Sequence, residues 1–169
     1  LPKPAAALAP PMPDALVARF RAIVGERYAI TDPDDQVPYL RDDRGLYHGR
    51  TPLVVRPGST AEVAAVMALA HETGTPVVPQ GGGTGLVGGH VPHEAGFEII
   101  LSLNRMTAVR TVDPAGNTMT VDAGVTLQQA QDAAAAAGRL FPLNIGSKGS
   151  CTIGGNLSTN AGGTQAVAY

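Results

Sequence analysis

Hydrophobic positions near the start of the chain follow a helical period. Apolar side chains over residues 14–24 fall on one face of a helix, which Asp14 is expected to cap and Gly25 to end. A second, short helix is expected over residues 33–40, because Asp32 precedes a proline at its first position. The pattern therefore predicts that the chain begins with two helices.

The stretch between residues 53 and 103 alternates short apolar runs with one helical run. The expected elements are a strand at 53–56, a helix at 60–73, a strand at 76–79 and a strand at 98–103. Ser59 and Glu62 have the spacing of a capping box before the helix, and Gly74 is expected to end it. Strands and a helix in this order predict a small α/β unit with parallel strands.

The last third of the chain has a different pattern. Residues 108–113 and 118–122 alternate polar and apolar side chains around a turn, which predicts an antiparallel hairpin. Thr126 and Gln129 form a second capping box, which opens an Ala-rich helix that Gly138 is expected to end. We therefore expect a mixed, partly antiparallel piece after the α/β unit.

Composition narrows the class of protein. The chain has 169 residues, of which 44% are hydrophobic and 15% charged, and a formal net charge of −2. These values are typical of a globular domain, and the lack of a basic stripe argues against nucleic-acid binding as the main task. No apolar run approaches the roughly 18 residues of a membrane span, and a single cysteine excludes an internal disulfide.

Both ends of the chain look irregular in sequence. Prolines interrupt every apolar run in residues 1–13, so this stretch is expected to be a flexible leader or an artificial extension rather than a signal peptide. The chain ends directly after a glycine-rich stretch that no strand closes, so we expect it to be a truncated piece of a longer protein.

Glycine is concentrated in two stretches. Residues 81–89 hold six glycines and residues 146–163 hold six more, out of 21 in the whole chain. Clustered glycines indicate sharp turns or close approach of the backbone to a ligand. In the first stretch, residues 83–88 match the G-x-G-x-x-G dinucleotide fingerprint, but no helix can open there and no Gly-Lys-Ser/Thr follows. A non-helical nest of amides around an anion is the remaining functional interpretation, with Thr84 as an added donor, and a loop without function is the alternative.

The second stretch interleaves glycine with Ser, Thr and Asn. Such a surface offers many neutral donors and acceptors together with close backbone access, which suits a flat polar ring. Two stretches of this kind in one chain indicate one long ligand with a pyrophosphate at one end and a polar ring system at the other.

Residues 79–89 together with residues 144–163 resemble the FAD-binding half of the vanillyl-alcohol-oxidase and PCMH-type flavoproteins. The resemblance covers roughly residues 35–169 and is greatest to the D-2-hydroxyglutarate, D-lactate and glycolate dehydrogenases. It implies an α+β fold in which an α/β subdomain is followed by a mixed antiparallel subdomain. The implied division is an N-terminal leader with helices at 1–50, a small α/β FAD-binding subdomain at 51–106, and the start of a second FAD-binding subdomain at 107–169, with the C-terminal substrate domain absent.

The same resemblance implies a set of cofactor-binding residues. Those of the first stretch are Pro79, Gly81, Gly82, Gly83, Thr84, Gly85, Leu86 and Gly89. Those of the second are Pro142, Gly146, Gly149, Ser150, Gly154, Gly155, Asn156, Thr159, Asn160 and Gly163. The family's metal ligands and proton acceptor lie in the half beyond this chain, so no metal site is expected here and the catalytic residues stay unknown.

The expected cofactor is FAD held without a covalent bond. Covalent members of the family carry a His in the first loop or a Cys in the second. No His stands beside Thr84, and the non-covalent dehydrogenases also have a cysteine at the position of Cys151. The resemblance implies that the full-length protein passes a hydride from C2 of a D-2-hydroxyacid to flavin N5, whereas this chain alone is inactive. The alternative is a non-catalytic flavin- or nucleotide-binding module or an inert proteolytic fragment.

The resemblance and the composition leave the partners only partly defined. A small 2-hydroxyacid is the expected substrate of the full-length protein, with an unknown electron acceptor, no nucleic acid, no transmembrane segment and a cytoplasmic location. Two interpretations stay open for each of four local features. His90 and His93 are either site residues or ordinary surface residues, and Lys148 either faces an anion or is solvated. The charged and aromatic segment 41–49 either borders the substrate or another domain, or forms a salt-bridge cluster.

Overall fold

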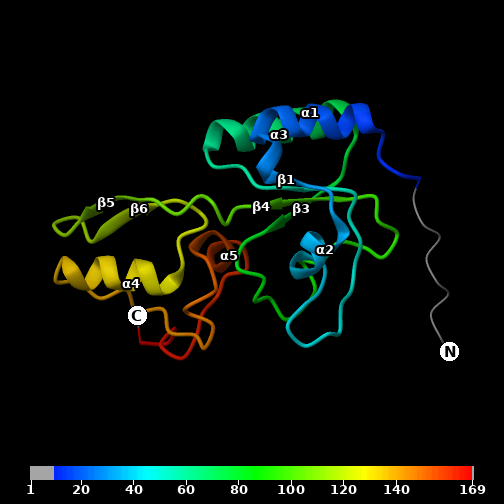
Figure 1. The fold of residues 1–169 in the computed structure, drawn as a ribbon. Coiled ribbons are helices and arrows are strands. Elements are labelled where there is room, and N and C mark those ends of the chain that lie inside the picture. The colour runs from blue at the N-terminus through cyan, green and yellow to red at the C-terminus, as the bar shows by residue number, and fades with distance from the viewer. Residues whose placement is uncertain (1–9, 169) are drawn as a thin grey trace. The chain divides into compact units, whose positions relative to one another are not determined.

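The structure is a computed structural model that describes residues 10–168, so most of the stretch predicted as a leader lies outside the described residues. The described chain divides into two compact units, coloured by residue number in Figure 1. Unit 1 consists of residues 10–80 and 85–102, and unit 2 of residues 81–84 and 103–168. The chain therefore passes into unit 2 and back within the first glycine stretch.

Unit 1 is built on a four-stranded sheet of order β1-β2-β4-β3. β2 (Val54–Val55), β4 (Ile99–Ser102) and β3 (Val77–Gln80) run parallel, which confirms the prediction of a parallel α/β unit. β1 (Ala29–Ile30) pairs antiparallel with β2 and was not predicted.

The helices of unit 1 follow the apolar pattern. They are α1 (Asp14–Val24), the short turn η1 (Glu26–Tyr28), α2 (Pro33–Gln36) with its continuation η2 (Val37–Tyr39), and α3 (Thr60–Thr73). Gly25 and Gly74 end α1 and α3 with positive φ, and Asp32 and Ser59 cap α2 and α3, as predicted. Asp14 was predicted to be a cap, and this was wrong: Pro13 occupies the cap position and Asp14 lies in the first turn.

The core of unit 1 joins these helices to the sheet. Phe20 of α1 and Val66 of α3 are fully buried, as are Val54, Val55 and Ile100 of the central strands. Continuous burial along both central strands is typical of a parallel sheet covered on both faces, and it explains why their sequences read as apolar runs.

Unit 2 combines a hairpin with two helices. β5 (Val109–Asp113) and β6 (Thr118–Val121) pair antiparallel, as predicted. α4 (Leu127–Ala136) begins with the complete Thr126–Gln129 capping box, also as predicted. α5 (Ile153–Ser158) lies inside the second glycine stretch and was missed, because its two adjacent glycines are poor helix formers. The core of this unit includes Val125, Leu127 and Ile153.

No helix among residues 10–168 is long and apolar enough to cross a membrane.

Candidate functional site

The first glycine stretch leaves the sheet of unit 1 without forming a helix. β3 ends at Gln80, and residues 81–90 consist of bends and turns. The absence of a helix at this point confirms that the G-x-G-x-x-G match is not a Rossmann fingerprint, since that motif places an anion on a helix N-terminus.

Within unit 2, residues 81–84 pack on the second glycine stretch. A Cβ placed on Gly82 would overlap the backbone carbonyl oxygen of Ser150 and lie 2.7 Å from its carbonyl carbon. A Cβ on Gly81 would overlap Oγ1 of Thr152, a side chain that is 3% exposed. The two stretches, which the sequence presents separately, are therefore in backbone contact, and glycine is required at both positions.

Three glycines of the two stretches face open space within unit 2. A Cβ on Gly83, Gly146 or Gly149 would meet no atom of the described residues within 4 Å. Gly83 has a φ of +70°, which by itself favours glycine, but Gly146 and Gly149 have no positive φ. Within the described residues, neither packing nor backbone conformation requires glycine at those two positions, which is compatible with the predicted close approach of a ligand.

α5 is held by contacts at its N-terminus. Oγ1 of Thr152 accepts a hydrogen bond from the N–H of Gly155 at 3.4 Å, and the N–H of Ile153 donates to Val125 at 2.8 Å. A Cβ on Gly154 would lie 2.7 Å from the Cβ of Ala123, whereas one on Gly155 would have only an ordinary contact at 3.4 Å. The first helical glycine is therefore needed for packing and the second is not.

The single cysteine is buried beneath this helix. Cys151 is 3% exposed, and its Sγ accepts a hydrogen bond from Nδ2 of the buried Asn156 at 3.6 Å. A thiol enclosed in the core has no free path to a ligand ring, which supports the expectation of a non-covalent cofactor.

The end of the second stretch folds back on its beginning. Asn144 and Gly163 form an isolated parallel bridge, and a Cβ on Gly163, whose φ is +78°, would overlap the carbonyl oxygen of Asn144. Oγ1 of Thr159 donates to the carbonyl of Gly155 at 2.8 Å, and Asn160 is exposed with a φ of +51°. Packing against Asn144 by itself therefore requires glycine at 163.

The predicted cofactor residues are divided between the two units. Those in unit 1 are Pro79, Gly85, Leu86 and Gly89. Those in unit 2 are Gly81, Gly82, Gly83, Thr84, Pro142, Gly146, Gly149, Ser150, Gly154, Gly155, Asn156, Thr159, Asn160 and Gly163. Their roles toward a cofactor stay predictions.

The histidines after the first stretch have protein partners. His93 Nδ1 lies 2.8 Å from Oε1 of Glu98, whose other oxygen accepts the backbone N–H of His93 at 2.6 Å. The Glu98 side chain is 10% exposed and that of His93 is 75% exposed, so the buried carboxylate orients an imidazole on the surface. His90 packs beside Gly85, and its buried Nε2 has no hydrogen-bond partner among residues 10–168. Among residues 10–168, no three His, Cys, Asp or Glu residues are grouped as a metal site.

Asp42 organises the segment for which a salt-bridge cluster was one interpretation. Its side chain is 2% exposed, and its Oδ1 accepts the backbone N–H of Tyr47 at 2.8 Å. The N–H of Tyr47, followed by those of Leu46, Arg44 and Asp42 itself, holds the pKa of the Asp42 carboxyl below its usual value, against the opposing effect of burial. Backbone donors rather than ion pairs stabilise this carboxylate.

The charge of Asp42 makes the protein sensitive to acid. The pKa of Asp42 is lower in the folded than in the unfolded state. The carboxylate therefore stabilises the fold fully at a pH above its unfolded pKa of about 3.9, and this stabilisation is lost as the pH falls through the folded pKa. We expect Asp42→Asn to be less stable than the natural chain in urea unfolding at about pH 7, and the difference to shrink toward about pH 3. A difference independent of pH would contradict this prediction.

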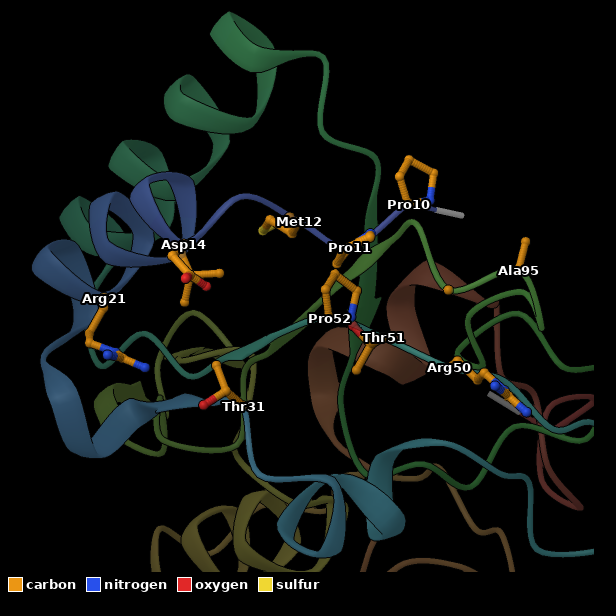
Figure 2. Close-up of a pocket in the computed structure, with 12 residues that line it drawn as sticks. Pro10, Pro11, Met12, Asp14, Arg21, Thr31, Arg50, Thr51, Pro52 and Ala95 are labelled. Atoms are coloured by element: carbon orange, nitrogen blue, oxygen red, sulfur yellow. The ribbon is translucent and has the colours of Figure 1, made fainter. Parts of the chain in front are cut away.

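The two cavities described below are lined by residues other than the predicted cofactor residues. A cavity of about 490 Å³ in unit 1 is lined by Asp14, Arg21, Arg50 and apolar residues of the N-terminal segment (Figure 2). Arg21 and Arg50 lie on opposite sides of it in Figure 2, and Arg21 also pairs with Glu26 at 3.2 Å. A second cavity of about 430 Å³ lies in unit 2 beside Arg139. None of the predicted cofactor residues lines either cavity.

Comparison with known proteins gives both a family and a fold. Residues 51–169 match the family described as FAD binding domain. A probable mitochondrial D-2-hydroxyglutarate dehydrogenase of Oryza sativa subsp. indica is 40% identical over 153 residues, covering 90% of this chain and 27% of the relative. A putative mitochondrial D-lactate dehydrogenase of Schizosaccharomyces pombe is 38% identical over 157 residues, covering 89% of this chain and 30% of the relative. This chain thus spans about three tenths of the length of these relatives.

Solved structures support the same fold. An alkyldihydroxyacetonephosphate synthase superposes with a TM-score of 0.84 at 24% identity, over 96% of this chain and 32% of that chain. A p-cresol methylhydroxylase superposes with a TM-score of 0.69 at 21% identity, over 90% of this chain and 31% of that chain. The α+β fold of PCMH type and the resemblance to D-2-hydroxyacid dehydrogenases are both confirmed. The chain belongs to the FAD binding domain family.

Proposed function

We propose that this chain forms the FAD-binding part of a flavin-dependent D-2-hydroxyacid dehydrogenase. The main support is the open backbone at Gly146 and Gly149, where no contact with another residue of the described structure requires glycine. Membership of the FAD binding domain family supplies the chemical identity of the ligand that would come this close. The relatives named for D-2-hydroxyglutarate and D-lactate support the class of substrate.

The two stretches would divide the cofactor between them. The backbone amides of residues 81–85 would donate to the pyrophosphate, with the hydroxyl of Thr84 as an added donor, because a glycine nest can hold an anion without a lysine. The residues proposed to line the flavin are Pro142, Gly146, Gly149, Ser150, Gly154, Gly155, Asn156, Thr159, Asn160 and Gly163. Pro79, Leu86 and Gly89 would flank the pyrophosphate loop.

In the full-length protein, the bound flavin would accept the hydride from C2 of the hydroxyacid at its N5. The task of this chain is then to hold and orient the cofactor and to exclude water from one side of it. A group that takes the hydroxyl proton and one that holds the carboxylate are also needed, and we assign neither to this chain.

Binding is tested with FAD and the purified chain, and activity with the full-length protein. We expect the fluorescence of FAD to be quenched when it binds. We also expect acid precipitation of the protein to release all yellow colour into the supernatant, because Cys151 is buried and no His stands in the first loop. Colour that stays with the pellet would show a covalent bond. Lack of FAD binding by both the chain and the full-length protein would overturn the proposal.

Activity separates the dehydrogenase from a simple binding module. Under anaerobic conditions, the full-length protein should lose its flavin absorbance with one of D-2-hydroxyglutarate, D-lactate or glycolate, and the 169-residue chain should not. Full-length protein that binds FAD but is bleached by none of the three would favour the alternative of a non-catalytic flavin- or nucleotide-binding module.

Substrate, acceptor and location of the full-length protein belong to the same proposal. A small 2-hydroxyacid is the proposed substrate, the electron acceptor is not assigned, and the net charge of −2 argues against nucleic acid as a partner. A cytoplasmic location is proposed from the sequence alone, whereas the two curated relatives described above are named as mitochondrial.

A further inference from the structure

Residues 39–50 run along unit 1 as a segment that precedes the matched FAD binding domain. We call this segment the strap. Its residues 39, 44 and 47 contact the two points at which the first glycine stretch leaves and re-enters unit 1, and Arg50 donates its N–H to the carbonyl of His93 at 3.2 Å.

The exit point is Gln80, the last residue of β3. Its side chain is 5% exposed, and its Nε2 donates to the carbonyl oxygens of Tyr39 and His90, at 3.0 Å each. One buried amide thus joins the start of the strap, the start of the loop and the residue that follows the loop. Because a buried amide donor without a partner is costly, this three-way connection is strongly favoured once formed.

The re-entry point, residues 85–90, is held by two strap side chains. The guanidinium of Arg44 donates to the carbonyl oxygen of Leu86. The ring of Tyr47 packs so closely on Gly88 that a Cβ there would lie 2.6 Å from Cδ1 of the ring. Contact between an aromatic face and a glycine backbone of positive φ leaves the loop little room to shift.

The strap is itself held in shape by local hydrogen bonds. Asp42 accepts the N–H of Tyr47 through Oδ1 at 2.8 Å and donates its own N–H to the Tyr47 carbonyl at 3.3 Å. The N–H of Gly45 donates to the carbonyl of Asp42 at 3.0 Å, and Arg41 and His48 form an isolated antiparallel bridge. Arg44 and Tyr47 therefore project from a closed turn rather than from a free loop.

We propose that the strap positions the first glycine stretch for FAD, with Arg44 and Tyr47 as positioning residues. Residues 81–84 follow Gln80 directly and are joined through Gly85 to Leu86, so fixing Gln80 and Leu86 restricts the conformations of the amides between them. This lowers the entropy that the loop loses when it binds the pyrophosphate. The inference rests on the proposed function and extends it to residues outside the matched domain.

The test compares FAD affinity among strap variants of the full-length protein. Tyr47→Ala should raise the Kd for FAD about tenfold, which corresponds to the upper range of one aromatic packing contact. Arg44→Gln should raise it severalfold, and Tyr47→Phe, which keeps the ring, should bind as the natural protein does. Arg41→Ala is the matched control, because its exposed side chain makes no hydrogen bond to residues 80–93 within the described structure.

A second ligand separates positioning from general stability. Riboflavin lacks the pyrophosphate, so Tyr47→Ala and Arg44→Gln should lower affinity for FAD without lowering affinity for riboflavin. Equal losses for both ligands, or unchanged FAD affinity in both variants, would overturn the proposal. If Tyr47→Ala fails to fold, the exposed Arg44 gives the same comparison by itself. Natural protein that does not bind FAD would instead contradict the proposed function.

Discussion

Gly82→Ala is expected to abolish stable FAD binding. The added methyl group would overlap the carbonyl oxygen of Ser150 and lie 3.1 Å from Cα of Cys151, and backbone atoms cannot rotate away as a side chain can. Residues 81–84 would separate from the second glycine stretch, so the two proposed halves of the cofactor site would no longer be held together. We expect a loss of FAD affinity of roughly 100-fold, or about 3 kcal/mol, the upper range for overpacking. Equilibrium titration of the apoprotein with FAD measures it.

Gly83→Ala is the matched control, one residue along the same loop. Its φ of +70° makes alanine strained, but a Cβ there would meet no protein atom within 4 Å. The backbone cost is about 1 kcal/mol, so we expect a loss of FAD affinity of roughly fivefold. If Gly82→Ala binds FAD as tightly as Gly83→Ala, the contact with Ser150 does not build the site.

Gly154→Ala is expected to destabilise unit 2 and to lower FAD content with it. The new Cβ would lie 2.7 Å from the Cβ of Ala123 and 2.9 Å from its carbonyl oxygen, at the point where α5 begins. Either the helix or residue 123 must move, and we expect a loss of about 1–3 kcal/mol in the free energy of unfolding. Urea unfolding of the apoprotein checks this without the cofactor.

Gly155→Ala separates packing from ligand approach in the same helix. Its Cβ would have an ordinary contact of 3.4 Å with Oγ1 of Thr152, and replacing glycine by alanine inside a helix stabilises it by roughly 0.5–1 kcal/mol. We therefore expect unchanged or slightly higher stability together with weaker FAD binding, because Gly155 is proposed to line the flavin. A variant with natural FAD affinity would remove Gly155 from the proposed site, and one as unstable as Gly154→Ala would contradict the packing argument.

Local signals in the sequence were sufficient for most regular elements. α1, α3 and α4 were predictable because helical periods, capping residues and terminal glycines act within one or two turns of the chain. The hairpin of β5 and β6 was predictable for the same reason, since its turn and its alternation are adjacent. α5 was not, because its stability comes from Thr152 and from packing on Ala123 rather than from the helix propensity of its own residues.

The candidate site shows the same division. The clustering of glycines by itself predicted which two stretches would approach a ligand, and their resemblance to a known family predicted which cofactor to expect. Only the tertiary structure decided at which positions packing excludes a Cβ. A Cβ on Gly82 or Gly163 would overlap a carbonyl group that is distant in sequence, whereas one on Gly146 or Gly149 would meet open space. All four residues are glycines, and the sequence does not distinguish them. Their surroundings differ because folding brings different residues close to each of them.

The contacts of the strap show most clearly what only the tertiary structure decides. In the sequence, residues 41–49 are a charged and aromatic run, for which a salt-bridge cluster and a substrate or domain border were both open interpretations. In the structure, Asp42 binds backbone N–H groups, and Tyr47 lies against Gly88 of the glycine stretch. Side-chain identity and spacing determine secondary structure because those interactions are local, but they do not determine which distant backbone a side chain meets. That is decided only when the sheet of unit 1 places β3 and the strap beside each other through the buried amide of Gln80.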